Sequence, residues 1–175
     1  DITDDVDKVH LLSFMSHLFW RSPSTDDLFA SLIEKEGLCN EYFGLYNEKT
    51  GKPYTDESDM VAPMKERMIN DPEFAKIFKI LIPSSDGGRR HIVDLVDKWK
   101  LFELNPKCEM EFLLGDVPFV WYNPNQTIRN TFDKIIFPIC KNKVLILNDN
   151  KAKFIDELII RNINLSILKL SSRFI

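Results

Sequence analysis

The sequence predicts an α+β fold, in which an antiparallel β-meander at about residues 98–148 packs against N-terminal and C-terminal helices. Apolar residues recur at helical spacing through residues 4–20 and 72–82. Short runs rich in β-branched and aromatic residues then alternate with turn residues up to about residue 148, and helical spacing returns after it. The connections between these runs are short, which favours antiparallel neighbours, because parallel strands need a long crossover.

The first 83 residues are predicted to be mainly helical. Acidic residues crowd the start of the first helix, where the helix dipole favours them, and the segment Arg-Ser-Pro at 21–23 ends it. A second helix is expected from Ser24 to about Gly37, a residue that commonly ends helices. Residues 38–63 are polar and show no sustained period, so we expect a loop there, exposed and mobile at 47–59.

A short helix is expected over residues 64–70, followed by a helix that Asp71 caps and Pro72 begins. Its apolar period indicates which side chains it buries. These are Phe74, Ile77, Phe78 and Leu81. The glycine pair in SSDGGRR, at 84–90, favours a loop after this helix.

The segment 92–148 holds the predicted sheet. Its strand-like runs are KWKLFEL, EMEFLL, PFVWY, KIIFPI and KVLILN. Residues 149–175 are predicted to be helical, with Asp149 or Asn150 as the first cap and Phe154, Ile155, Leu158 and Ile159 on the first of two helices. The three parts, 1–83, 92–148 and 149–175, are expected to make a single domain.

Composition narrows the class of protein. The chain has 175 residues, 44% of them hydrophobic and 29% charged, which is typical of a globular domain. A formal net charge of -4 argues against a nucleic-acid partner, and the sequence has no apolar run of the ~18 residues that a membrane span needs. Three widely spaced cysteines indicate reduced thiols in a cytoplasm and fit no zinc site. The first residue is Asp1, so we expect a fragment of a longer chain.

Several short motifs are similar to a known family. The order WKLFELN, FLLGDVPFV, IIFPICKNKVLIL and NINLSILKLSSRFI resembles the C-terminal part of an uncharacterised bacterial domain family, whose fuller members open with a His-Tyr-Ile-Pro-Gln motif. The early helix ending in WRSP resembles that family's helix with an Arg-x-Pro end. The resemblance implies a fold and boundaries but no chemistry, because a fold does not determine a function.

The chain departs from that family at the positions that could carry chemistry. Leu114 and Gly115 stand where the family has Thr-Ser before the aspartate, and Val117 stands where it has Asn. Cys140 replaces a serine, and the His-Tyr-Ile-Pro-Gln segment is absent. An activity shared between that segment and Asp116 would therefore be incomplete here.

The candidate catalytic residues are Asp116, Asp149 and Lys151. Asp116 follows a strand-like run, where a carboxylate can serve as an acid or a metal ligand, but Gly-Asp before Pro118 is also ordinary turn chemistry. Asp149 and Lys151 form a D-x-K pattern of the kind that binds Mg²⁺ and activates water in some nucleases. The same pattern is equally typical of a helix cap. The turn and cap interpretations are preferred.

A candidate anion-binding cluster lies at Arg89, Arg90 and His91. Guanidinium groups after a flexible glycine pair can hold a phosphate, although a solvated loop is the simpler interpretation. No cofactor and no metal site is expected.

The preferred functional hypothesis is a non-enzymatic or incomplete domain that serves protein–protein or intramolecular interaction. Consecutive apolar residues such as Phe119 to Tyr122 indicate a strand covered on both faces. We therefore expect an exposed apolar patch or edge strand that pairs with a second copy of the chain or with a missing N-terminal segment. The alternative is a metal-dependent phosphodiesterase or nuclease.

Overall fold

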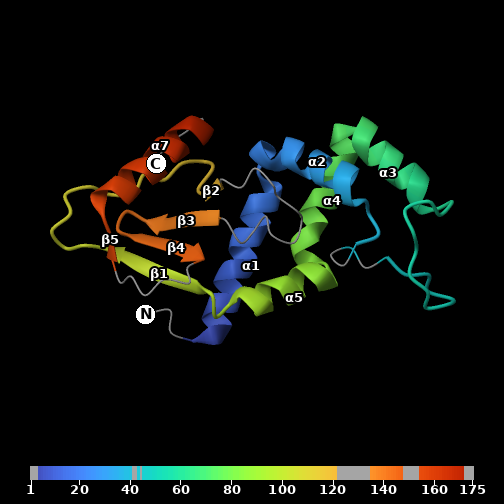
Figure 1. Cartoon of the computed structure of the whole chain (residues 1–175), viewed down its shortest axis with the longest axis horizontal. Helices are drawn as coiled ribbons and strands as arrows, with labels where there is room; N and C mark the ends of the chain where they lie inside the picture. Colours follow the sequence, from blue (N-terminus) through green and yellow to red (C-terminus); the bar gives the residue numbers. More distant parts are fainter. Residues whose placement is uncertain (1–3, 41–42, 44, 122–134, 148–153, 172–175) are drawn as a thin grey trace. The chain divides into compact units, whose positions relative to one another are not determined.

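A computed structural model describes residues 4–40, 43, 45–121, 135–147 and 154–171 (Figure 1). Helices come first along the chain, strands follow, and a helix comes last, so the predicted α+β class is confirmed. The described residues divide into two compact units, one up to Asp94 and one from Leu95.

The first unit is helical. Its helices are α1 (Asp5–Arg21), α2 (Asp26–Glu36), α3 (Val61–Asn70), α4 (Pro72–Leu81) and α5 (Asp86–Leu95), with 3₁₀ turns at Pro23–Thr25 and Ile82–Ser84. Aspartates begin two of the helices: Asp4 accepts a hydrogen bond from the backbone N–H of Val6, and Asp71 accepts one from that of Phe74, both at 3.1 Å.

The core of this unit is apolar and partly aromatic. Trp20 meets Phe19 and Phe29 edge to face, with ring centroids 5.0 and 6.2 Å apart. Its other fully buried large side chains are Leu12, Met15, Leu32, Ile33, Leu38, Met68 and Ile82.

The second unit contains a five-stranded sheet in the order β2-β3-β4-β1-β5. Its elements are β1 (Trp99–Leu104), β2 (Val120–Trp121), β3 (Ile135–Cys140), β4 (Lys143–Leu147), β5 (Phe154–Ile155) and α7 (Glu157–Leu170). The predicted antiparallel pairing is present, since β1, β2, β3 and β4 pair antiparallel. The predicted simple meander is wrong in its order, because β1 pairs with β4 and β5 runs parallel to β1.

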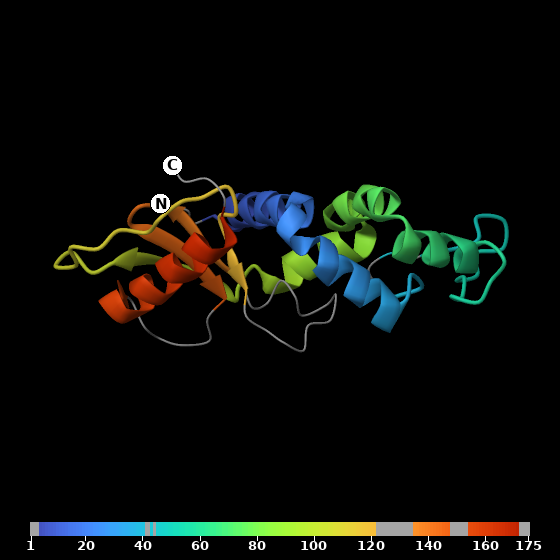
Figure 2. The same ribbon diagram turned by 90° about the horizontal axis from the view of Figure 1, so that it is seen from above.

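Helix α7 covers one face of this sheet (Figure 2). One side of α7 contributes Ile160, Ile163 and Ile167. The sheet and the segments beside it contribute Phe102, Phe112, Val120, Ile136, Val144 and Ile155. Ile135 and Leu145, neighbours of Ile136 and Val144 along their strands, are buried as well, so β3 and β4 contain consecutive buried apolar residues.

Three predicted elements take another form. The expected loop SSDGGRR is the beginning of α5: the Ser85 hydroxyl accepts a hydrogen bond from Gly88 N at 3.0 Å. A Cβ atom at Gly88 would lie 2.2 Å from the carbonyl oxygen of Ile82, so this glycine serves close packing rather than flexibility.

The C-terminal helical part also differs. Phe154 and Ile155 form β5, and one helix follows, capped by Asp156, which accepts a hydrogen bond from Ile159 N at 2.9 Å. The expected caps Asp149 and Asn150 lie outside the described residues.

The predicted strand EMEFLL is not a strand. The Phe112 N–H donates to the Lys141 carbonyl, between β3 and β4, at 2.7 Å, and the residues beside Phe112 bond to helix α7. The Asn164 side chain on α7 accepts a hydrogen bond from Leu113 N at 2.9 Å and donates one to the Glu111 carbonyl at 2.8 Å. Ser171, at the end of α7, exchanges hydrogen bonds with Val117 N and O at 3.3 Å. Segment 111–117 is thereby fixed along α7.

We expect Asn164→Leu to lower the free energy of unfolding by about 1–2 kcal/mol, because it removes two hydrogen bonds to backbone groups near the surface. Urea unfolding measures the change. Asn162→Leu is the matched control, since Asn162 is exposed on the same helix. An equal loss in both variants would show that the amide of Asn164 does not fix segment 111–117.

Candidate functional site

The orientation of α4 is set by a buried lysine. Lys79 is only 2% exposed and forms an ion pair with Asp26 on α2. Its ammonium also donates hydrogen bonds to the Ser22 carbonyl at 2.8 Å and to the Thr25 hydroxyl at 3.2 Å. An ammonium group has three protons to donate, and these three oxygens accept them all.

The direction of Lys79 turns the apolar face of α4 toward solvent. The prediction that α4 buries Ile77 and Leu81 is wrong: these side chains are 59% and 52% exposed, whereas Ala75 and Lys79 face the core. Phe74 and Phe78 are half-buried, with ring centroids 5.1 Å apart. We call Phe74, Ile77, Phe78 and Leu81 the α4 stripe; Ile80, 38% exposed, flanks it.

The charges beside the α4 stripe neutralise one another. Lys76 pairs with Glu73 at 2.7 Å, and Arg67 pairs with Asp71 at 3.5 Å. The guanidinium carbon of Arg67 also lies 4.1 Å from the centre of the Phe74 ring. The stripe is therefore an apolar surface whose rim carries no excess charge of either sign.

A small hollow lies between α2, α3 and α4 in the same unit. It has a volume of about 90 Å³. Its lining includes both apolar and charged side chains, among them Phe29, Met68, Asp26 and Lys79. Pockets that bind drug-sized ligands have roughly 300–1,000 Å³, so this hollow does not suit a cofactor or a nucleotide.

Asp56 anchors the loop that precedes α3. One carboxylate oxygen accepts hydrogen bonds from the backbone N–H groups of Leu38 at 2.9 Å and Cys39 at 2.7 Å. The other oxygen pairs with Lys65 on α3 at 2.9 Å. Further along, a hairpin joins Leu45 to Tyr54, with Asn47 at its turn, so residues 45–54 are hydrogen-bonded although most of them are exposed. The predicted mobility of residues 47–59 stays a prediction.

These contacts shift two pKa values in opposite directions. Burial and the neighbouring Asp56 raise the pKa of the Cys39 thiol to about 11, so it is protonated at neutral pH. Burial also acts to raise the pKa of Asp56, but the hydrogen bonds from Lys65, Cys39 and Leu38 outweigh it and the net pKa is lowered.

The lowered pKa predicts a pH-dependent contribution to stability. A carboxyl whose pKa is lower in the folded chain stabilises the fold above its unfolded pKa, about 4, and loses that contribution as the pH falls through the folded value. We expect urea unfolding to show wild type more stable than Asp56→Asn at pH 7, with the gap narrowing below about pH 4. A gap that is constant from pH 7 to pH 3 would contradict this assignment.

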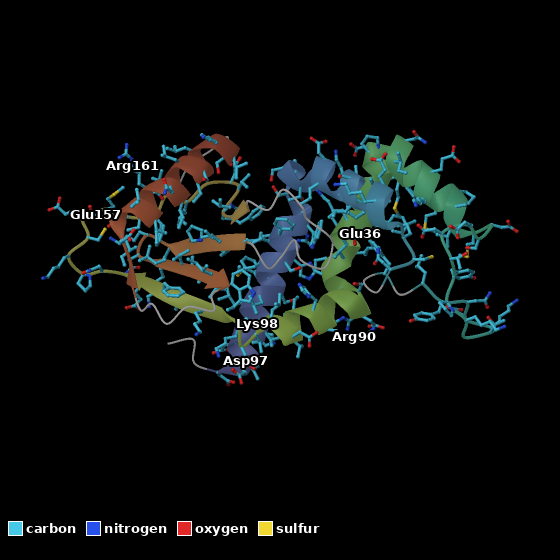
Figure 3. The ribbon with its side chains drawn as sticks, viewed as in Figure 1. Glu36, Arg90, Asp97, Lys98, Glu157 and Arg161 are labelled. Carbon is cyan, nitrogen blue, oxygen red and sulfur yellow. The ribbon has the colours of Figure 1, made fainter. Side chains whose placement is uncertain are left out.

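The predicted anion cluster does not converge on one site. Arg89 and Arg90 are consecutive residues of α5, about 100° apart around the helix. The Arg89 guanidinium donates to the Ser84 carbonyl at 3.0 and 2.7 Å, and Arg90 donates to the Asp86 carbonyl at 3.3 Å. Figure 3 shows Arg90 projecting from α5. His91 is half-buried on the same helix. These contacts use only Nε and Nη2 of Arg89 and only Nε of Arg90, so both guanidinium groups keep N–H donors, and anion binding by the cluster stays a prediction.

The predicted catalytic set is only partly described. Asp116 is exposed at a bend between Gly115 and Val117, in agreement with the turn interpretation. Asp149 and Lys151 lie outside the described residues, so their pairing with Asp116 stays a prediction. Within the described ranges, no three His, Cys, Asp or Glu side chains are placed to hold a metal ion. No described helix is long and apolar enough to cross a membrane.

The chain was compared with known protein families, with curated proteins and with solved structures, and none of the three comparisons gave a match. The resemblance to the bacterial domain family therefore remains an expectation.

Proposed function

We propose that the chain is a protein-interaction domain and that the α4 stripe binds an apolar helix face of a partner protein. The observation that carries the proposal is the inverted orientation of α4. A solvated helix normally places its charged residues outward, yet α4 turns Lys79 inward and leaves Ile77 and Leu81 in water. Contiguous exposed apolar side chains are typical of interaction sites.

The spacing of the stripe supports a helix as the occupant. Its residues stand at positions i, i+3, i+4 and i+7 of one helix, the pattern with which helices contact one another in grooves and bundles. The neutral rim supports a protein over other partners. A membrane surface or a nucleic acid attracts an excess of lysine and arginine, whereas the cations beside the stripe, Arg67 and Lys76, are already paired.

Site-specific photo-crosslinking in the native cell tests the proposal. A photo-reactive phenylalanine replaces Ile77 in one sample and Val93, an equally exposed residue of α5, in the control. We expect a discrete protein adduct from position 77 that is absent from position 93 and is lost when Leu81→Asp is added. Mass spectrometry then identifies the attached protein and the segment that contacts the stripe.

The interpretation of this experiment depends on an intact fold. Leu81→Asp replaces an exposed side chain, so we expect it to change the free energy of unfolding by no more than about 0.5 kcal/mol. The same adducts from positions 77 and 93, or crosslinks only to lipid or nucleic acid, would overturn the proposal.

A further inference from the structure

Helix α7 in the second unit is apolar on two sides. One side is buried against the sheet through Ile160, Ile163 and Ile167. The opposite side leaves Leu158 67% exposed, Leu165 46% exposed and Leu168 47% exposed. We call Leu158, Leu165 and Leu168 the α7 leucine face.

The leucine face has the spacing of a helix–helix seam. Leu158 and Leu165 are seven residues apart, and Leu168 follows three residues later, as in the a and d positions of a heptad. Arg161 occupies the remaining seam position, one turn after Glu157. Figure 3 shows both charged side chains near the beginning of α7. Glu157 and Arg161 stand at the i, i+4 spacing that favours opposite charges, and the aliphatic stem of arginine can cover an apolar neighbour.

The charges along α7 have a direction. Asp156 and Glu157 lie at its beginning, and Lys169 lies in its last turn. A second copy of α7 laid antiparallel would place the acidic end of each helix beside the basic end of the other. A parallel copy would place like charges together, so the charge order selects the antiparallel arrangement.

We infer that the α7 leucine face is a homotypic interface, in which α7 packs antiparallel against α7 of a second copy of this chain. In this arrangement a two-fold axis passes near Ile163. Leu158 of each copy then lies opposite Leu168 of the other copy, and Glu157 of each copy lies at the same height along the helix pair as Lys169 of the other. Such an interface is self-complementary, because the same surface serves both copies. It lies in a different unit from the α4 stripe and does not depend on it.

Sedimentation equilibrium of the full chain over a wide concentration range tests the inference. Wild type is expected to be a reversible dimer, and Leu168→Glu to weaken dimerisation at least tenfold, because it sets a carboxylate against Leu158 and beside Glu157 of the second copy. Ile159→Glu is the matched control, since Ile159 is an exposed apolar residue of α7 outside the leucine face, and it should leave the dimer intact. Circular dichroism and urea unfolding confirm that each variant is folded.

A charge exchange tests the antiparallel orientation. Lys169→Glu should weaken the dimer, and adding Glu157→Lys should restore it, because opposite charges again meet at both ends. A chain that stays monomeric at high concentration, or a dimer that Leu168→Glu leaves unchanged, would overturn the inference. A dimer abolished by Ile77→Asp but unaffected by Leu168→Glu would overturn it while leaving the α4 stripe as an interface.

Discussion

Replacing Lys79 by methionine is expected to lower the free energy of unfolding by about 3 kcal/mol. The substitution leaves Asp26 without its partner and removes the donor that the Ser22 carbonyl and the Thr25 hydroxyl share. Breaking a buried ion pair from one side costs about 3–5 kcal/mol, and the Asp26 side chain is 31% exposed, which places the loss at the low end. Urea unfolding at neutral pH measures it.

Two further variants separate the ion pair from the volume of the side chain. Lys76→Met lies on the same helix, and its exposed pair with Glu73 contributes little, so we expect a change within about 0.5 kcal/mol. Lys79→Met combined with Asp26→Asn should recover about 1–2 kcal/mol, because no unpaired carboxylate remains. If Lys79→Met costs less than about 1 kcal/mol, the lysine does not fix the orientation of α4.

Gly37→Ala is expected to cost about 3 kcal/mol. Gly37 ends α2 with φ 73° and ψ -173°, a backbone region that is essentially restricted to glycine. A Cβ atom there would lie 1.6 Å from a carboxylate oxygen of Asp56, so Asp56 would have to leave the N–H groups of Leu38 and Cys39. The backbone strain and the lost hydrogen bonds therefore both lower the free energy of unfolding.

Gly51 provides the control, because it also has a positive φ, 65°, but nothing lies within 4 Å of its missing Cβ. Gly51→Ala should lower the free energy of unfolding by only about 1 kcal/mol, because the left-handed backbone is the only source of strain there. The difference between the two variants in urea unfolding reports the displacement of Asp56. Equal losses at both glycines would show that Asp56 gives way without cost.

The sequence indicated where most helices and strands lie but not how they face or pair. The apolar period of residues 72–82 identified α4 correctly, yet it placed the wrong side inward. The partners that turn Lys79 to the core, Ser22, Thr25 and Asp26, lie 53 to 57 residues earlier in the chain. A local pattern cannot contain that information, because tertiary contacts override local preference.

The same limit applies to the second unit. The runs that became β1, β3 and β4 were recognisable by composition, but pairing of β1 with β4 depends on residues 40 to 48 positions apart. Residues 109–114 look like a strand, and only the contacts of Asn164 show that they follow α7 instead. Ser85 is a residue type that commonly caps the beginning of a helix, but the glycine pair at 87–88 favoured a loop, so the start of α5 was not predicted.

The candidate sites were the least predictable part. Arg89 and Arg90 were grouped because they are adjacent in sequence, but adjacency on a helix separates side chains. The α4 stripe and the α7 leucine face were visible only as an expectation of some exposed apolar patch. Their positions follow from which face each helix buries, which the three-dimensional contacts determine.

The affinity of the protein that crosslinks at position 77 decides whether the α4 stripe is a binding surface. The dissociation constant of that purified protein is measured by calorimetry with wild type, with Leu81→Asp and with Val93→Asp. The α4 stripe predicts at least a tenfold weaker complex for Leu81→Asp and an unchanged one for Val93→Asp. The same dissociation constant for wild type and Leu81→Asp would contradict the proposed function.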